Sequence, residues 1–492
     1  MRNFILFSAF AILSLPCLSH AQFTLPDIPD IDFLTKISPP PLAITHVTVI
    51  DATGVAAKSD MTVIIKNGHI DKIGKANKVT VPDSAKVVSG KGKFLIPGLW
   101  DMHVHWSETD YLPLFVANGV TGIRIMWGQP VHQQWRRSLR NGDWTVPHLS
   151  IASPIIDGPK PFWPTSISVK NQAEARKAVD DSVAGGADFI KVYSLLPDDL
   201  YKAIVDEAKK LHVSFAGHVP NDVGATAASN AGQKSIEHLT GIIAAISDNP
   251  DISKLLTLKY LKDASLADLS HFDIDELKGL VAASQTGRKE RADALYALFK
   301  KNGTWQVPTL TVLHNFSNFD DPNLKHDARM KYMPRSVKDG WDPSKDFRFQ
   351  DYKQEDWDRQ KKVYVKHLKI VGDMNKAGVD ILAGTDVGNP FCFPGFSLHD
   401  ELGLLVDAGL TPMEALQAAT RNAAKYVGRL KSLGTVEEGK IADLILLDAD
   451  PLADIANTKK IRAVIKGGRL VDRAEIDTML KKIEKLAAKS KL

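Results

Sequence analysis

Short alternating runs of apolar and polar residues stand at both ends of the chain. Between residues 42 and 93 such runs predict β-strands, and Asn67-Gly68 between two of them predicts a tight hairpin turn. Similar runs return between residues 431 and 475. Two β-rich segments that flank a long middle predict one small β-sandwich, assembled from both segments.

The middle of the chain, residues 94–430, alternates apolar strand-like runs with helical stretches. This alternation is typical of βαβ units, and eight such strands predict an α/β fold, a TIM-like (β/α)₈ barrel. Insertions at about 242–303 and 314–357 are expected to shape the mouth of a pocket. The expected strands are 94–106, 119–127, 148–156, 188–194, 213–220, 234–241, 304–313 and 380–387.

Two helices are predicted near the end of the chain. Thr411 and Glu414 form a capping-box pattern with Pro412 at the first helical position, so a helix begins there. Residues 476–492 form a basic amphipathic helix. We interpret it as a solvated terminal helix in preference to a membrane-surface helix.

The first 21 residues have the pattern of an export signal. Arg2 precedes an apolar run at residues 4–15, and residues 19–21 suit a signal peptidase. The run is too short for a permanent anchor, so we expect a periplasmic or secreted protein without a stable membrane anchor. A proline-rich arm is expected at residues 22–41.

Composition narrows the picture in two respects. The chain has 492 residues and a net charge of +4, without a concentrated basic face, so a nucleic-acid partner is not expected. Its two cysteines are Cys17 and Cys392. Cys17 is expected to be removed with the cleaved export signal. The alternative is that Cys17 carries a lipid, but Pro16 directly before it is a poor fit to a lipid-attachment site. Cys392 is then a packed thiol, and no internal disulfide can form.

Metal-capable side chains stand at the ends of five predicted strands. His103 and His105 have an i, i+2 spacing that turns both rings to one side of the first strand. The carboxyl ends of barrel strands form the active-site rim, so all these residues are expected to converge. Four imidazoles and one carboxylate suit Zn²⁺, Mn²⁺ or Co²⁺. The other members are Lys191, His218, His238 and Asp386, on strands four, five, six and eight.

Each of these residues also has a structural interpretation. A histidine in an apolar strand is often a core residue, Asp386 alone could cap a helix, and Lys191 alone could pair with an acid. The set as a whole is more specific than any member. The remaining histidines fall outside strand ends and are interpreted as structural; they include His46, His69, His212, His326 and His367.

The order His-x-His, Lys, His, His, Asp resembles that of the binuclear amidohydrolase superfamily. The resemblance covers nearly all of the chain after residue 21 and includes the segments Ile96–His105, Thr411–Thr420 and Gly434–Asp443. It is closest to the group of imidazolonepropionase-like proteins, prolidase-like dipeptidases and ochratoxin-hydrolysing amidases. Imidazolonepropionases proper look mononuclear, and Lys191 favours the two-metal branch.

This resemblance implies two divalent metal ions per chain, with zinc favoured and manganese, cobalt or iron as alternatives. Lys191 would carry a carbamate derived from CO₂ and bridge the two ions. A desolvated lysine loses its proton readily, so it can capture CO₂. His103, His105 and Asp386 would hold one ion, and His218 and His238 would hold the other.

The resemblance further implies attack on a carbonyl by a hydroxide that bridges the metals. Asp386 would take its proton and deliver it to the leaving amine. The leading hypothesis is hydrolysis of a peptide-like C–N bond in a dipeptide or an N-acyl amino acid, including ochratoxin-like amides. Ester, lactone or carbamate hydrolysis at the same site is the alternative, and a non-catalytic periplasmic metal-binding protein is a remote one. Deamination is disfavoured because deaminases of this superfamily lack the bridging lysine.

Residues around the predicted centre suggest how a small-molecule substrate binds. Tyr193 shares the inward face of Lys191 and could contact the substrate, although plain packing is the alternative. Arg124 and His132, on and after the second strand, could meet a substrate carboxylate. Assembly into a homo-oligomer is left open. Aromatic pocket walls are expected from Trp127, Trp163 and Trp305.

Overall fold

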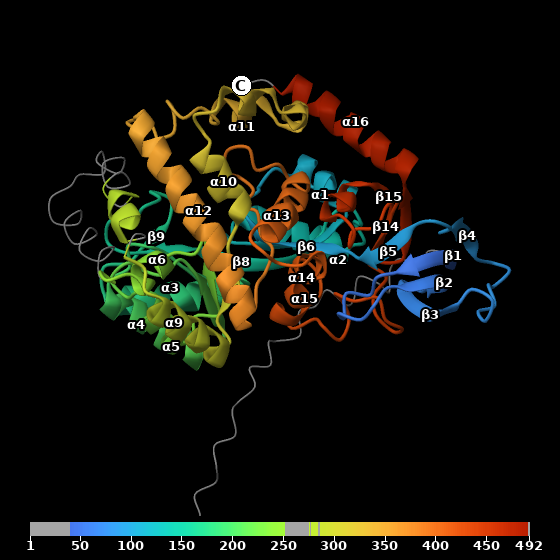
Figure 1. The fold of residues 1–492 in the computed structure, drawn as a ribbon, viewed down its shortest axis with the longest axis horizontal. Helices are drawn as coiled ribbons and strands as arrows, with labels where there is room; N and C mark the ends of the chain where they lie inside the picture. Colours follow the sequence, from blue (N-terminus) through green and yellow to red (C-terminus); the bar gives the residue numbers. More distant parts are fainter. Residues whose placement is uncertain (1–39, 251–274, 276, 284–285, 491–492) are drawn as a thin grey trace, which may run out of the picture.

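In the computed structural model, two sheets and their helices account for the described part of the chain (Figure 1). The predicted export signal (1–21) and nearly all of the predicted arm (22–41) lie outside the described residues. Part of the first insertion and the last two residues of the predicted terminal helix do as well. The structure describes residues 40–250, 275, 277–283 and 286–490.

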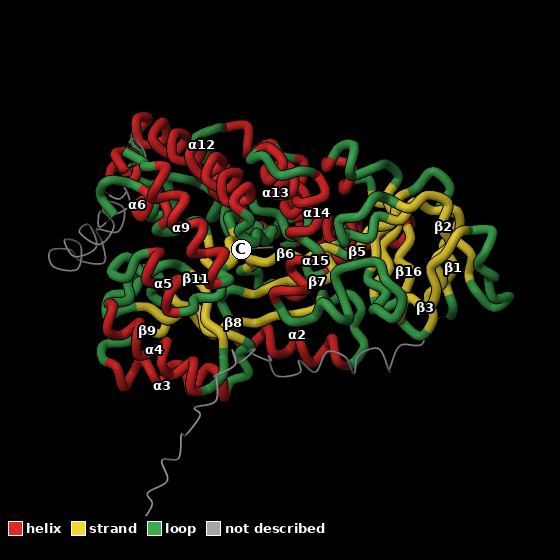
Figure 2. The backbone as a smooth tube through the Cα atoms, turned by 60° about the horizontal axis from the view of Figure 1, so that its bottom comes forward, coloured by secondary structure: helices red, strands yellow, loops and turns green. Residues whose placement is uncertain are grey.

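One sheet is a nearly closed parallel barrel in the order β13-β12-β11-β10-β8-β7-β6, with β9 paired to β8 (Figure 2). Every residue of β6 and β7 is buried, as expected for strands covered on both faces. The predicted fold class is confirmed. The strands are β6 Leu99–Val104, β7 Val120–Ile125, β8 His148–Asp157, β9 Ile167–Ser168, β10 Phe189–Val192, β11 Ser214–Gly217, β12 Ser235–Glu237 and β13 Trp305–Val307.

The eighth position of the barrel is filled by residues 380–387 without a regular strand. Ile381 bridges to β13, and Val387 bridges to β6, both in parallel. Backbone hydrogen bonds from Met102 to Ala383 (2.9 Å) and from Asp386 to His103 (2.8 Å) complete the closure. Residues 380–387 therefore occupy the predicted position in the barrel, but they form only isolated β-bridges in place of a regular strand.

Most of the other predicted strands were too long, and two of them end early for a clear physical reason. The expected strand 94–106 divides at Gly98: β5 (Phe94–Pro97) joins the second sheet, and only β6 joins the barrel. A Cβ on Gly98 would lie 2.3 Å from Oγ1 of Thr121, so the crossing requires glycine. The expected strand 304–313 ends at Val307 because Pro308 follows and Thr309 has φ 48°.

Helices cover the outside of the barrel (Figure 1). The predicted start at Thr411 is confirmed: its side chain accepts from the Glu414 amide, and the reciprocal bond is present. The insertion 314–357 begins within α10, continues as short helical turns and ends within α12. The helices are α1 Pro113–Ala117, α2 Pro130–Arg140, α3 Gln172–Ala184, α4 Asp198–Lys210, α5 Ala225–Ala231, α6 Ile242–Ile246, α9 Lys289–Asn302, α10 Leu310–Ser317, α11 Arg335–Asp339, α12 Gln354–Ala377, α13 Phe396–Asp407, α14 Pro412–Ala418, α15 Arg421–Tyr426 and α16 Arg473–Lys489, and the 3₁₀ turns are η2 Thr109–Tyr111, η4 Pro322–His326, η5 Ala328–Tyr332 and η6 Ile455–Lys459.

The second sheet combines the two ends of the chain, as predicted, in the order β16-β15-β14-β5-β1-β2-β3 (Figure 2). Asn67 (φ 51°) and Gly68 (φ 78°) form the predicted hairpin turn. The expected two-layer sandwich is one continuous hydrogen-bonded sheet. Its strands are β1 Leu42–Val49, β2 Lys58–Lys66, β3 His69–Lys75, β4 Lys86–Ser89 (paired to β1), β5, β14 Leu444–Leu447, β15 Ile461–Lys466 and β16 Arg469–Asp472.

This second sheet encloses its own apolar core. The β3 edge is linked to the segment before β14, through a bridge between His69 and Ile441 and a hydrogen bond from Ala442 N to Gly68 O of 2.8 Å. Inward residues from β1, β2, β5, β14 and β15 form one buried cluster. One continuous sheet thus encloses the apolar core that was expected to lie between two layers.

The terminal helix α16 is less solvated than expected. Ile476, Ile483 and Ala487 are buried, where the helix packs against α1 and η5. None of the helices in the described part of the chain is long and apolar enough to cross a bilayer.

Candidate metal centre

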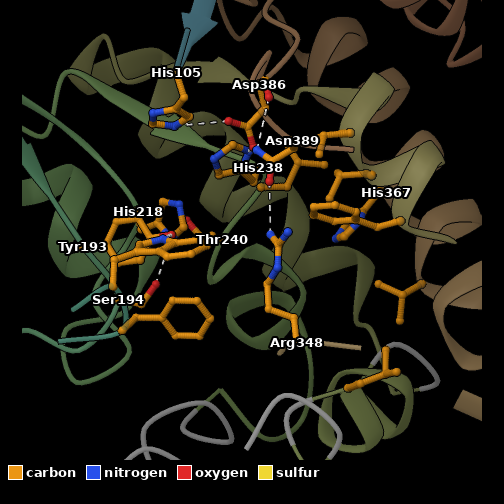
Figure 3. A pocket seen from close by; sticks show the side chains of 18 of the residues that line it. His105, Tyr193, Ser194, His218, His238, Thr240, Arg348, His367, Asp386 and Asn389 are labelled. Carbon is orange, nitrogen blue, oxygen red and sulfur yellow. Dashed lines mark hydrogen bonds and ion pairs between the residues drawn. The ribbon is translucent and has the colours of Figure 1, made fainter. Parts of the chain in front are cut away.

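The structure brings His105, His218, His238 and Asp386 together at the carboxyl end of the barrel (Figure 3), and His103 and Lys191 belong to the same cluster. The ring centroids of His103 and His238 lie 4.5 Å apart, and those of His218 and His238 lie 4.9 Å apart. Oδ1 of Asp386 lies 3.2 Å from Nε2 of His105 and 3.4 Å from Nε2 of His103. Potential ligand atoms of His103, His105 and Asp386 all lie within 4.8 Å of one another.

Three buried atoms in this cluster lack a hydrogen-bond partner among the described residues. They are Nδ1 of His105, Nζ of Lys191 and Oδ1 of Asp386. Lys191 is fully buried, and Asp386 is 7% exposed. Buried polar groups are nearly always paired, so an unpaired lysine amine among imidazoles and a carboxylate fits a centre that holds a further group. The donor set therefore fits divalent metal ions.

The backbone at these strand ends is strained. His238 has φ 57° and Asp386 has φ 61°, both in the left-handed region that disfavours non-glycine residues. Such conformations persist where the surroundings impose them, and they gather at functional sites. Here they turn both side chains toward the common centre (Figure 3).

Neighbouring side chains orient the histidine rings. Nδ1 of His103 donates to Glu237 at 2.8 Å, and Nδ1 of His238 donates to Oγ1 of Thr309 at 2.7 Å. Nδ1 of His218 is hydrogen-bonded to Ser194 at 2.8 Å. Because Nδ1 of each ring is hydrogen-bonded in this way, Nε2 is the nitrogen that can bind a metal ion. In known metal sites, a hydrogen bond to the other ring nitrogen likewise fixes the tautomer of the histidine ligand.

Burial sets the protonation states that metal binding needs. It lowers the pKa of His238 to about 4 and holds the pKa of His103 and His218 well below their usual range. Burial lowers the pKa of Lys191 to about 8. Burial would raise the pKa of Asp386, but His238, His105 and Lys191 lower it to about 2. The imidazoles of His103, His218 and His238 are therefore neutral and the Asp386 carboxylate is ionised, as coordination requires.

The expectation that Arg124 binds a substrate carboxylate is wrong. Arg124 is fully buried inside the barrel and does not line the pocket. Its Nη2 donates to Glu237 at 2.7 Å, and Nη1 donates to Ser235 and Tyr426 at 3.0 and 2.9 Å. Sequence analysis missed Glu237, whose carboxylate requires this cation and also orients His103.

His132 and Trp305 also lie away from the pocket. His132 is 1% exposed; its Nδ1 accepts from the Gln129 amide and its Nε2 bonds to the Trp106 carbonyl, so it caps α2. Trp305 begins β13 and packs against Tyr426. Both expectations of substrate contact are corrected. Cys392 is buried as expected.

A cavity of about 490 Å³ opens from the centre, a size typical of small-molecule sites. Tyr193 lines it, stacked on His218 with ring centroids 3.9 Å apart, and its hydroxyl accepts from Nε1 of Trp163 at 2.8 Å. Trp127 lines it as predicted. Further aromatic wall comes from Phe162, Trp163, Phe316, Phe349 and Tyr352.

An arginine and a histidine of the cavity wall were not predicted. Arg348 comes from the second insertion, and His367, interpreted as structural, comes from α12. Burial lowers the pKa of His367 to about 4. Neither residue lies at a strand end, which was the signal used. Arg348 stands in an aromatic stretch, Phe347-Arg348-Phe349, and that context is the one signal for it.

Comparisons with known proteins agree with this architecture. Residues 316–471 match the Amidohydrolase family. The chain is 25% identical over 445 residues to an ochratoxinase of Aspergillus niger, covering 76% of this chain and 75% of the relative.

Solved structures show the same fold. A bottromycin amidohydrolase superimposes with a TM-score of 0.71 at 22% identity, covering 94% of this chain and 95% of that one. A putative prolidase from Bifidobacterium longum superimposes with a TM-score of 0.64 at 22% identity, covering 91% and 100%. The family, the fold and the His103–His105–Asp386 group together indicate a hydrolase with a metal centre.

Proposed function

We propose that this chain, a hydrolase whose residues 316–471 match the Amidohydrolase family, hydrolyses the C–N bond of a small amide with two divalent metal ions. The substrate is a dipeptide or an N-acyl amino acid. Zinc is the favoured metal.

One observation carries this proposal: the unpaired, fully buried Lys191 beside the histidines and Asp386. In this proposal Lys191 would carry a carbamate and become an anionic ligand of the metal centre, which would give its nitrogen the partner that the protein does not provide. His103, His105 and Asp386 would hold one ion, and His218 and His238 would hold the other. When bound, the ions lower the pKa of water and polarise a carbonyl.

The chain's own residues then handle the proton and the substrate. The ionised Asp386 accepts the proton of the attacking water and passes it to the leaving nitrogen. The Tyr193 hydroxyl accepts from Trp163, so its own O–H turns to the cavity, where it can donate to the substrate carbonyl. Burial raises the pKa of Tyr193 and keeps that proton in place.

The cavity supports a substrate with an apolar or aromatic part. Its wall includes Trp127, Trp163 and Phe349, and aromatic walls favour flat apolar groups. An ochratoxinase is among the relatives, so ochratoxin-like amides belong to the substrates proposed here.

The test is release of amine by the zinc- or manganese-loaded chain from a panel of dipeptides and N-acyl amino acids. Asp386→Asn is the control for the site. Asp443→Asn, a buried aspartate outside the site, is the matched control for folding. Cleavage that disappears only in Asp386→Asn supports the proposal. If a metal-loaded chain cleaves no member of the panel, the proposal is contradicted, and esters, lactones and carbamates are assayed next.

A further inference from the structure

One buried glutamate, Glu401, supports the helix that follows the seventh barrel strand. It lies in α13, which packs against α10 (Figure 1), and it is fully buried. Its Oε1 accepts from the Leu310 amide at 3.0 Å, and its Oε2 accepts from the Thr311 amide at 2.7 Å and from the Thr311 hydroxyl at 2.9 Å. Three donors thus converge on one carboxylate.

The two amides belong to the first turn of α10, which begins at Leu310. The first amides of a helix have no partner inside the helix, and the helix dipole favours a carboxylate beside them. The residue before the helix, Thr309, does not cap it with its own side chain. Glu401 therefore provides the cap from another helix, 91 positions from Leu310 in the sequence.

Thr309 connects this cap to the candidate metal centre. It is fully buried in the left-handed region, with φ 48° and ψ 49°, which disfavours a β-branched residue. Its hydroxyl donates to the Pro308 carbonyl at 2.8 Å, so Oγ1 is left to accept from Nδ1 of His238 at 2.7 Å. This arrangement assigns the ring proton of His238 to Nδ1 and leaves Nε2 for a metal ion.

A second histidine of the cluster is supported in two similar steps. Nδ1 of His103 bonds to Glu237 at 2.8 Å, and Arg124 in turn holds Glu237 at 2.7 Å. At His238 the supporting group is a hydroxyl, which can rotate to suit its neighbours. Its direction therefore depends on how firmly the backbone around it is held.

We propose that Glu401 is a positioning residue of the metal centre: by capping α10 it keeps Thr309 in the left-handed conformation and thereby fixes the ring of His238 with Nε2 toward the metal ions. Glu401 does not line the cavity, so it acts through α10. The inference rests on the metal centre of the proposed function and adds a residue outside the cavity that controls metal affinity.

The test measures the dissociation constant for zinc, by competition with a chelator, in the wild type, two single variants and the double variant. Thr309→Val removes the hydroxyl and should weaken zinc binding by about 10- to 100-fold, the range for loss of a group that orients a metal ligand. Glu401→Gln has one side-chain oxygen for two amides and should weaken zinc binding by about tenfold. The double variant should bind zinc about as tightly as Thr309→Val alone, because the two residues act in one series of contacts.

Two results of this comparison would overturn the proposal. One is unchanged zinc binding in Glu401→Gln, and the other is losses that multiply in the double variant, since Glu401 would then not act through Thr309. Asp443→Asn is the matched control, because it removes a buried carboxylate outside the site. It should lower stability and leave the zinc affinity intact; an equal loss of zinc affinity there would reduce the effect of Glu401→Gln to one of general stability.

A measurement on the metal-free chain separates this inference from the proposed function. Nitrogen NMR of the chain with isotope-labelled histidine reports which ring nitrogen of His238 carries the proton, and loss of the signal in His238→Gln assigns it. We expect the Nδ1–H tautomer in the wild type and in Asp443→Asn, and a mixture of tautomers in Glu401→Gln.

If the wild-type chain binds no zinc, the proposed metal centre fails, yet the NMR comparison still decides the role of Glu401. A wild-type His238 ring protonated at Nε2 would refute that role. So would an unchanged tautomer in Glu401→Gln.

Discussion

Asp386 and Asp443 are both buried aspartates that interact with a lysine and a histidine, but only one of the two clusters is complete. Asp443 lies between the barrel and the second sheet, 3.2 Å from Nζ of Lys466 and 2.9 Å from Nε2 of His148. Its other oxygen accepts from the Gly467 amide at 2.7 Å. Near Asp386, by contrast, Nζ of Lys191 has no hydrogen-bond partner in the described part of the chain, and in this sense the Asp386 cluster is incomplete.

The difference shows what each cluster is for. The Asp443 cluster contains its own counter-charge, so it joins two parts of the molecule without help from outside. The Asp386 cluster repeats the residue types and the burial, but its buried lysine has no hydrogen-bond partner among the described residues. Burying an unpaired amine costs free energy, and the metal ions proposed above would offset that cost through a carbamate on Lys191.

The largest expected effect concerns turnover. Asp386→Asn should reduce kcat by about 10²- to 10⁴-fold, the range for loss of a positioned proton carrier, because Asn cannot accept the proton. Steady-state assays of the metal-loaded chains measure this. A variant that keeps wild-type turnover would remove Asp386 from the chemistry.

The reverse effect is expected at the complete cluster. Asp443→Asn removes the carboxylate that pairs with the buried Lys466, which should lower the free energy of unfolding by about 3–5 kcal/mol. Denaturant titration measures the loss, and metal content and kcat per folded chain should be unchanged. A stable Asp443→Asn chain would contradict the contrast between the two clusters.

Removal of metal should affect stability through the incomplete cluster alone. At a free-metal concentration of 100 to 1,000 times Kd, chelation costs the wild type about 2.7–4.1 kcal/mol. Thermal melting with and without chelator measures the shift, and Asp443→Asn should show the same shift as the wild type. Chelation without effect on either chain would argue against a bound ion.

The smallest expected effect is a pH dependence of the complete cluster. Burial would raise the pKa of Asp443, but the charges of Lys466 and His148 lower it below the ordinary 3.8. A lowered folded-state pKa contributes stability above pH 3.8 that is lost as the pH falls toward the folded value. The stability gap between metal-free wild type and Asp443→Asn should therefore narrow below pH 3.8. Unfolding free energies from pH 5 to 3 would show this; a gap that widens would contradict it.

The sequence predicted the barrel and the cluster of six because both follow from periodic patterns. His103 and His105 stand at the end of a strand, where i, i+2 spacing fixes a common direction. His218 and His238 follow their strands in the same way. The structure places all of them at one end of the barrel, with rings 4.5 to 5.0 Å apart.

The substrate contacts were harder to predict, because polar partners can be distant in sequence. Arg124 was expected at the pocket, yet it pairs with Glu237, 113 positions away, inside the barrel. A carboxylate on a buried strand, such as Glu237, needs a cationic partner. This need was the signal for the position of Arg124 that the sequence analysis overlooked. Arg348 reaches the cavity from an irregular insertion and His367 from a long helix, and neither element has a strand end to mark the site.

The most direct test of the central claim is elemental analysis of the purified chain after loading with zinc and removal of unbound metal. The account predicts about two ions per chain in the wild type and in Asp443→Asn, and fewer in Lys191→Met, which cannot form the bridge. A folded wild-type chain that retains no metal, or a Lys191→Met chain that retains both ions, would contradict the account.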